Sequence, residues 1–273
     1  MNQRQKALLH LQYILGRLFV FVTVPLMYAA LKTLRYSIRD LRSTRRTVKY
    51  HLSQHRGPWL VCANHLTMID SVILAYAMAP LWRYAIRFNE APWNLPERAN
   101  FQRNIVLTIL CYLTKCIPVS RGGDREEMKK TLDSCLYQLN HGQPLLIFPE
   151  GGRSRTGFVN TEIFSYGAGR LALTAESCRV LCLYLRGDGQ SSYSNIPRYK
   201  ERFTVLVDSI KPHSNHSGLK GHRDCARQII EKLAAMEKIY LDTHWQRYRG
   251  PRGTAHQDEE QGCTIPGARL HSA

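Results

Sequence analysis

The sequence predicts an α/β protein with a mixed, largely parallel central sheet flanked by helices, and with an N-terminal membrane-anchoring helical segment. Short apolar runs of strand length alternate with longer stretches of helical spacing, a pattern typical of a largely parallel sheet. An apolar segment close to the N-terminus predicts the anchor. The expected strands are residues 59–63, 84–88, 116–119, 145–148, 180–185 and 203–207. The expected helices are residues 70–79, 101–113, 124–139, 168–177 and about 222–240.

Composition divides the chain of 273 residues into three parts. Residues 1–45 form a membrane-associated helical segment with a basic flank, and residues 46–247 form one large domain. Hydrophobic residues make up 44% of the sequence, which is enough for that domain to have a substantial core. Residues 248–273 are polar, rich in Gly and His and without periodicity, so we expect a disordered tail.

The N-terminal segment is strongly apolar from Leu11 to Leu34 and is interrupted by Arg17 and Pro25. A signal peptide is one interpretation, but the segment has a poor cleavage site. A single transmembrane helix is another, and a helical pair broken near Pro25 that enters one leaflet is the preferred one. Basic residues on both flanks place both ends on the cytoplasmic side. We therefore expect monotopic or single-span anchoring at the cytoplasmic face of the inner (cell) membrane.

The formal net charge of +17 indicates a polyanionic partner, either nucleic acid, an anionic membrane or a phosphorylated substrate. Basic residues crowd beside the apolar segment, and no helix-turn-helix, zinc-finger or RNP-like pattern is present. This distribution favours an anionic phospholipid membrane and argues against nucleic acid. The eight cysteines lie in apolar stretches without metal-like spacing, which indicates reduced core thiols and no metal site.

The first chemical motif follows the expected strand 59–63, where four residues separate His65 from Asp70. A turn that joins a strand to a helix is a common place for reactive groups in α/β proteins. Asp70 can accept a hydrogen bond from one ring nitrogen of His65, which leaves the other nitrogen as a base. In the alternative interpretation Thr67 is a helix N-cap and His65 an ordinary turn residue.

The second motif, Phe-Pro-Glu-Gly-Gly-Arg-Ser-Arg-Thr-Gly, occupies residues 148–157 after the expected strand 145–148. Gly151 allows close approach of a ligand to the backbone. Arg153 and Arg155 have only Glu150 as a local acidic partner, so they suit a phosphate. A solvated basic turn is the alternative.

The third motif is the stretch 117–121, which ends another expected strand with Arg121. Arg121 is either a surface residue paired with Asp124 or Glu127 or a further ligand for phosphate. Strand ends of one sheet can converge on one crevice, which would bring His65 close to these arginines.

Together these blocks resemble the glycerolipid acyltransferases, a family typified by 1-acyl-glycerol-3-phosphate acyltransferase. Residues 64–70 resemble the family block N-H-x-x-x-x-D, residues 148–157 resemble F-P-E-G-T-R-S-R-S-G, and residues 117–121 match the block between them. Their order and spacing agree over about residues 45–210. Gly152 replaces the usual threonine, and the expected fourth block, residues 180–185, lacks the usual proline. These departures bear on the identity of the acceptor more than on the chemistry.

The resemblance implies that residues 46–247 are an acyltransferase domain that moves a fatty acyl group from a thioester, acyl-CoA or acyl-ACP, to the hydroxyl of a lysophospholipid. The most direct acceptor is 1-acyl-glycerol-3-phosphate, which gives phosphatidic acid. His65 is the implied base and Asp70 orients it. The acceptor is bound by five residues: Arg121, Glu150, Gly151, Arg153 and Arg155. Arginines hold its phosphate, with Arg155 the weaker candidate, and Glu150 orients the glycerol or locks an arginine.

No metal or organic cofactor is implied beyond the thioester co-substrate. Several alternatives remain open at this level. One alternative keeps the acyltransferase but gives it another lysolipid or a specialised lipid as acceptor. A second is a hydrolase that uses Cys62 or Ser154 as nucleophile. The others are a nucleic-acid-binding protein and a membrane scaffold without catalysis.

Overall fold

The computed structural model describes residues 1–101, 104–120, 122 and 124–244. Residues 1–237 form one compact unit that contains the elements described below, apart from the end of the last helix. The expected tail, 248–273, lies outside the described residues. The strands are β1 (Ser37–Ile38), β2 (Trp59–Ala63), β3 (Trp93–Asn94), β4 (Leu145–Ile147), β5 (Arg179–Gly187) and β6 (Arg202–Ile210). The helices are α1 (Gln3–Thr33), α2 (Leu41–Ser53), α3 (Asp70–Met78), α4 (Leu81–Ile86), η1 (Phe88–Glu90), α5 (Arg98–Phe101), α6 (Ile105–Leu113), α7 (Arg125–Asn140), α8 (Gly167–Thr174) and α9 (Gly218–His244).

The strands form one sheet in the order β1-β6-β5-β2-β4-β3, in which only the β5–β6 pair is antiparallel. This confirms the mixed, largely parallel sheet. Cys62 of β2 lies opposite Ile147 of β4 and Cys182 of β5, so these three strands run in register at the centre. Because they are parallel, the loops that follow them leave from the same edge of the sheet.

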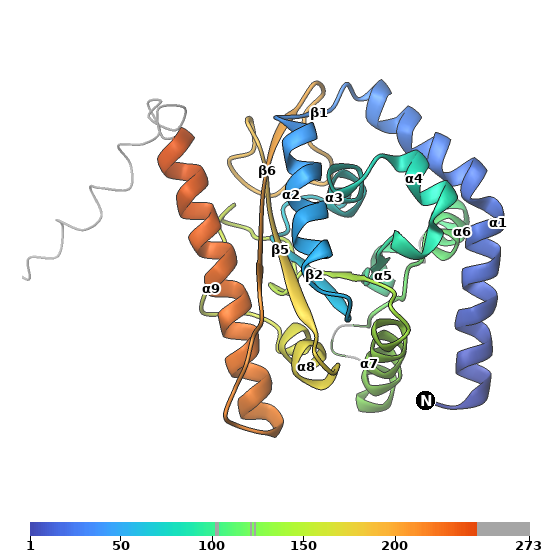
Figure 1. Ribbon diagram of the computed structural model, residues 1–273. Coiled ribbons are helices and arrows are strands. Elements are labelled where there is room, and N and C mark those ends of the chain that lie inside the picture. The colour runs from blue at the N-terminus through green and yellow to red at the C-terminus, as the bar shows by residue number, and fades with distance from the viewer. Residues whose placement is uncertain (102–103, 121, 123, 245–273) are drawn as a thin grey trace, which may run out of the picture. The chain divides into compact units, whose positions relative to one another are not determined.

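Both faces of the sheet are covered by helices, which explains why β2 is buried at all five positions. Val61 and Ala63 pack in the core cluster shared with α2 and α3, while Leu60 and Cys62 point to the other face because strand side chains alternate. Figure 1 shows α2 and α3 on one side of β5 and β6, with residues 218–237 of α9 on the other. α8 approaches α9 closely at Gly169, where an added Cβ would lie 2.0 Å from the carbonyl oxygen of His222.

Two of the expected strands are wrong. Residues 84–88 fall in α4 and η1, where Tyr84 and Phe88 are both buried at a spacing of four. Residues 116–119 make only two isolated bridges, at Cys116 and Val119, and Pro118 between them has no N–H to donate to a ladder. The expected helix 101–113 is instead divided into α5 and α6.

The N-terminal segment is one continuous helix, α1, with Pro25 inside it, rather than the expected pair broken at that residue. It is long and apolar enough to cross a membrane and is a candidate membrane anchor. α1 packs against α4, α6 and α7 of the domain. Buried residues of α1 on both sides of the proline, among them Val20 and Leu31, offset its cost, about 3 kcal/mol in a helix interior.

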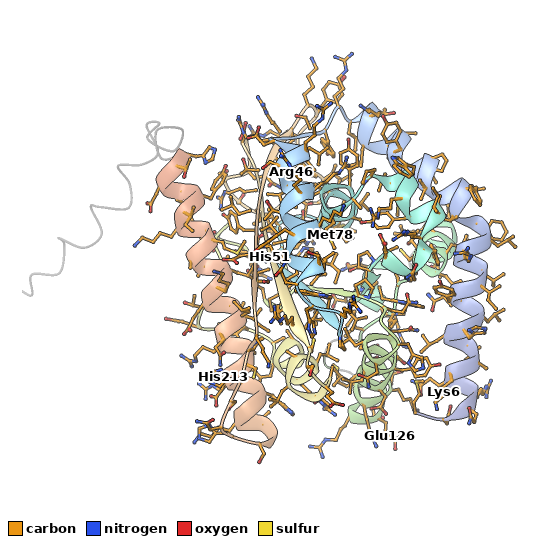
Figure 2. All side chains as sticks on the ribbon, viewed as in Figure 1. Lys6, Arg46, His51, Met78, Glu126 and His213 are labelled. Atoms are coloured by element: carbon orange, nitrogen blue, oxygen red, sulfur yellow. The ribbon has the colours of Figure 1, made fainter. Side chains whose placement is uncertain are left out.

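Polar contacts fix α1 to the domain as well. Gln5 Nε2 donates to the Lys130 carbonyl oxygen and to Ser134 Oγ, both at 2.8 Å. Gln12 Nε2 donates to the carbonyl oxygens of Tyr112 and Cys116. In Figure 2, Lys6 marks the N-terminal end of α1 and Glu126 marks the first turn of α7.

The outer face of α1, with its neighbours α4 and α6, is apolar and exposed. Its exposed large side chains are Leu8, Leu11, Ile14, Leu18, Phe19, Phe21, Val22 and Leu26 on α1, Trp82 and Ile86 on α4, and Ile105, Val106 and Ile109 on α6.

Candidate active site

Asn64 directly follows β2 and fixes the chain where it leaves the sheet. Its side chain is buried, donates to the Leu185 carbonyl oxygen (2.9 Å) and accepts from the Leu185 N–H (2.7 Å). The amide thereby replaces one step of the ladder with β5, and His65 is the first residue of the turn that follows.

Asp70, the first residue of α3, organises that turn from a fully buried position. Its Oδ2 accepts hydrogen bonds from His65 Nδ1 (3.0 Å) and from the N–H groups of Leu66 and Thr67 (both 2.7 Å). The Thr67 hydroxyl donates to Oδ1. The residue that precedes α3 is Ile69, so Thr67 is not the N-cap that the alternative interpretation required.

The His65 ring is held in one orientation. It stacks on Phe148 with 4.0 Å between ring centroids and an interplanar angle of 14°. Because Nδ1 is bonded to Asp70, Nε2 is the nitrogen left to take a proton. The ring lies on the wall of a cavity. Phe148 belongs to the second motif, but its contact with His65 was not predicted.

Glu150 braces the same turn from the neighbouring strand end. Its Oε1 accepts from the His65 N–H at 3.0 Å. Burial raises the pKa of Glu150 from 4.5 to about 8, although the hydrogen bond from the backbone of His65 opposes this rise. Glu150 is not among the residues that line the cavity, and its carboxyl group accepts hydrogen bonds from the backbone of His65 and of Asn160.

The loop after Glu150 is fastened to the turn and to the rest of the domain. The Ser154 N–H donates to the His65 carbonyl oxygen at 2.8 Å. Farther along, buried Arg186 donates from Nη1 to the Gly157 carbonyl oxygen (2.6 Å), and Glu237 accepts from the Val159 N–H (3.0 Å). The chain from Ser154 to Val159 is therefore held by hydrogen bonds to the turn, to β5 and to α9.

The cavity has a volume of about 610 Å³ and extends from the turn to α1. Three of the predicted site residues line it: His65, Gly151 and Arg153. Gly151 has a φ of +69°, which favours glycine. Much of the remaining wall is apolar and includes Val20, Val24 and Met27 of α1, Ile69 and Val72 near the start of α3, and Leu107 of α6.

Two of the other predicted binding residues, Glu150 and Arg155, do not line the cavity, and Arg155 is exposed. Arg121 lies outside the described residues, although its neighbour Gly122 does line the cavity. A second hollow of about 470 Å³ shares Gly122 and Met128 with the cavity and adds the cations of Arg125, Lys129 and Arg170.

Neither nucleophile considered from the sequence is suitably placed. Cys62 is fully buried in β2, and burial raises the pKa of its thiol well above the ordinary value. Ser154 Oγ donates to the Phe158 carbonyl oxygen at 2.5 Å. Among the described residues, no group of three or more His, Cys, Asp or Glu side chains is arranged to hold a metal ion.

The connection between β5 and β6, which the sequence did not implicate, also reaches the site. Asn195 Oδ1 accepts from Arg153 Nη1 at 2.7 Å. No sequence signal identifies Asn195, because it lies in a polar loop without a motif.

Residues 44–186, more than half of the chain, match the family model of the acyltransferases. The matched region contains the His65 turn and the loop after β4, and it confirms the resemblance seen in the motifs. The chain therefore belongs to the acyltransferase family, the family of the glycerolipid acyltransferases.

Proposed function

We propose that this acyltransferase is membrane-associated and moves a fatty acyl group from acyl-CoA or acyl-ACP to the hydroxyl of a lysophospholipid. The first acceptor to test is 1-acyl-glycerol-3-phosphate, whose product is phosphatidic acid. One observation carries the proposal: His65, whose ring is bonded to buried Asp70, lies on the wall of a large, mostly apolar cavity that Arg153 also lines. Such a cavity suits a molecule with a long apolar chain and a polar end.

In the proposed reaction, His65 Nε2 takes the proton of the acceptor hydroxyl as its oxygen attacks the thioester carbonyl carbon. Asp70 holds the ring through Nδ1 and stabilises the imidazolium that forms. The tetrahedral intermediate then expels the thiolate, which takes the proton back from His65. An oxygen ester has replaced the thioester, and the enzyme is returned to its starting state without a covalent acyl-enzyme.

Arg153, and Arg121 by resemblance, bind the phosphate of the acceptor in this proposal. Charge-assisted N–H···O bonds from arginine suit that group. The second hollow, with Arg125, Lys129 and Arg170, adds positive charge next to the cavity. This favours anionic substrates over neutral ones.

The contacts of α1 support anchoring in the plane of one leaflet. Gln5 and Gln12, which lie more than one helical turn apart, both hydrogen-bond α1 to the domain. Farther along α1, Val20 and Leu31 are buried against the domain. A helix held along its length in this way presents a face to lipid, whereas a spanning helix would have to leave the domain. The exposed apolar side chains of α1, α4 and α6 suit insertion into the leaflet, with basic flanks at anionic headgroups. We place this face at the cytoplasmic side of the inner membrane.

The test is an acyl-transfer assay in membrane fractions, with labelled acyl-CoA and acyl-ACP in separate arms and a panel of lysolipid acceptors. Products are identified by mass spectrometry. We expect acylation of phosphorylated lysolipids by the wild type and no turnover by His65→Ala. The matched control is His51→Ala on α2 (Figure 2), because His51 contacts Ser209 at 2.8 Å and does not line the cavity.

Retention of more than a few per cent of activity in His65→Ala would remove His65 from the role of base. If the wild type acylates a lysolipid without phosphate as well as one with it, the phosphate site is wrong. Gly152, in place of the family threonine, makes other lysolipid headgroups a necessary part of the panel.

A further inference from the structure

The connection between β5 and β6 touches two of the three motif loops at one point, the 193–195 segment. Its backbone is bonded to the catalytic turn twice. The Ser194 N–H donates to the Leu66 carbonyl oxygen, and the Met68 N–H donates to the Asn195 carbonyl oxygen, both at 3.1 Å. These bonds are made by residues that lie between His65 and Asp70, so two backbone hydrogen bonds join the 193–195 segment directly to the turn.

The same segment holds the guanidinium group of Arg153. Nη1 donates to Asn195 Oδ1 at 2.7 Å and to the Ser194 carbonyl oxygen at 3.2 Å. The group also lies over the Tyr193 ring, 5.6 Å from its centroid. Arginine carries five N–H donors, and these contacts use the donors of Nη1. Among the residues that the structure describes, no hydrogen bond is made by Nη2 or Nε of Arg153, so these donors are available to a ligand. The bonds of Nη1 set their direction.

The segment is itself fixed from behind, so it can act as a rigid support. Tyr36 Oη donates to the Pro197 carbonyl oxygen at 2.8 Å, and the Lys200 N–H donates to the Leu34 carbonyl oxygen at 2.9 Å. Asp188 pairs with Arg39 at 2.5 Å at the other end of the connection. The chain directly after α1 therefore supports the loop that supports Arg153.

We propose that Asn195 is a positioning residue that aims Arg153 at the phosphate of the acceptor, which rests on the function proposed above. Because the 193–195 segment is bonded to the His65 turn as well, it sets the spacing between the phosphate site and the base. The hydrogen bond from Arg153 to the Asn195 side chain orients the guanidinium group, so its loss weakens binding of the acceptor. Binding of the thioester donor and the position of the His65 ring are not changed.

The test is steady-state kinetics of Asn195→Ala with 1-acyl-glycerol-3-phosphate and acyl-CoA or acyl-ACP, whichever the wild type uses. We expect the KM for the acceptor to rise about tenfold, which corresponds to about 1.4 kcal/mol. The kcat and the KM for the donor stay within about twofold. Asn195→Asp, which keeps an acceptor oxygen for Nη1, restores the KM. The matched control is Ser192→Ala, an exposed residue of the same connection, with wild-type kinetics.

A double-mutant cycle with Arg153→Ala separates positioning from general support of the loop. In the Arg153→Ala background, Asn195→Ala should change the acceptor KM by less than about twofold. A further full tenfold rise in that background would overturn the proposal. A fall in kcat and Tm together with a rise in both KM values would also overturn it, since that pattern shows a structural role.

The result also distinguishes this proposal from the function on which it rests. If the wild type does not acylate phosphorylated lysolipids, the proposed function fails, and the role of Asn195 fails with it. If the wild type acylates them and Asn195→Ala leaves the acceptor KM unchanged, only the positioning role is refuted.

Discussion

Replacing Asp70 by asparagine removes the charge of this side chain and can keep its hydrogen bonds. The amide oxygen can take the place of Oδ2 and accept from His65 Nδ1 and from the N–H groups of Leu66 and Thr67. The amide NH₂ then lies at the position of Oδ1 and can donate to the Thr67 hydroxyl. The variant therefore tests whether the carboxylate charge stabilises the imidazolium during catalysis.

The size of the effect follows from the contact between the imidazole and the carboxylate, which measures 3.0 Å between Nδ1 and Oδ2. Two unit charges about 4 Å apart attract by about 4 kcal/mol at an effective dielectric constant of 20. The neutral amide oxygen retains part of this, so we expect kcat to fall about 10²- to 10³-fold. The loss of charge from three hydrogen bonds also lowers the free energy of unfolding, by up to about 3 kcal/mol.

The assay measures initial rates of acyl transfer by mass spectrometry, at a temperature where thermal unfolding shows that the variant is folded. Thr67→Val is the matched control, because it removes the hydroxyl bond to Asp70 and leaves the bond to His65 intact. We expect its kcat to stay within about threefold of the wild type. If Asp70→Asn keeps more than half of the wild-type kcat, the carboxylate charge has no part in the reaction.

Two further variants test the support of the site and the seating of α1. Glu150→Gln should unfold at a higher temperature than the wild type above pH 8. The wild type loses stability as the pH rises from 4.5 to about 8. In that range Glu150 ionises in the unfolded chain, whereas burial keeps it protonated in the folded protein by raising its pKa to about 8. Parallel Tm curves for the two proteins between pH 4 and 9 would contradict this. Gly16→Val should lower Tm by several degrees and expose α1 to limited proteolysis, since an added Cβ would lie 2.7 Å from the Leu113 carbonyl oxygen and 2.8 Å from the Phe88 ring. An unchanged Tm and digestion pattern would show that α1 is not seated there.

The sequence predicted the central strands because they are long, fully buried apolar runs. β2 and β5 are of this kind. It failed at residues 84–88, a short apolar run for which we predict a strand, although Tyr84 and Phe88 are buried at helical spacing. β1 and β3 have two residues each, too few to show any period, so neither was predicted.

The candidate site was predictable where its residues are close in the chain. His65 and Asp70 are bonded as their spacing indicated, and Gly151 and Arg153 reach the same cavity through parallel strand ends. The contact of Asn195 with Arg153 depends on β5 lying next to β2, which follows from the sheet order and not from any local pattern. The roles of these residues in binding and catalysis stay predictions.

The seating of α1 has a consequence for how the protein is made. α1 leaves the ribosome before α4, α6 and α7, which receive it and are translated only between residues 81 and 140. Until those residues have emerged, the helices that cover the inner face of α1 are missing and its apolar side chains stay accessible. Lipid can meet this helix during that interval, so delivery to the bilayer can precede folding of the domain.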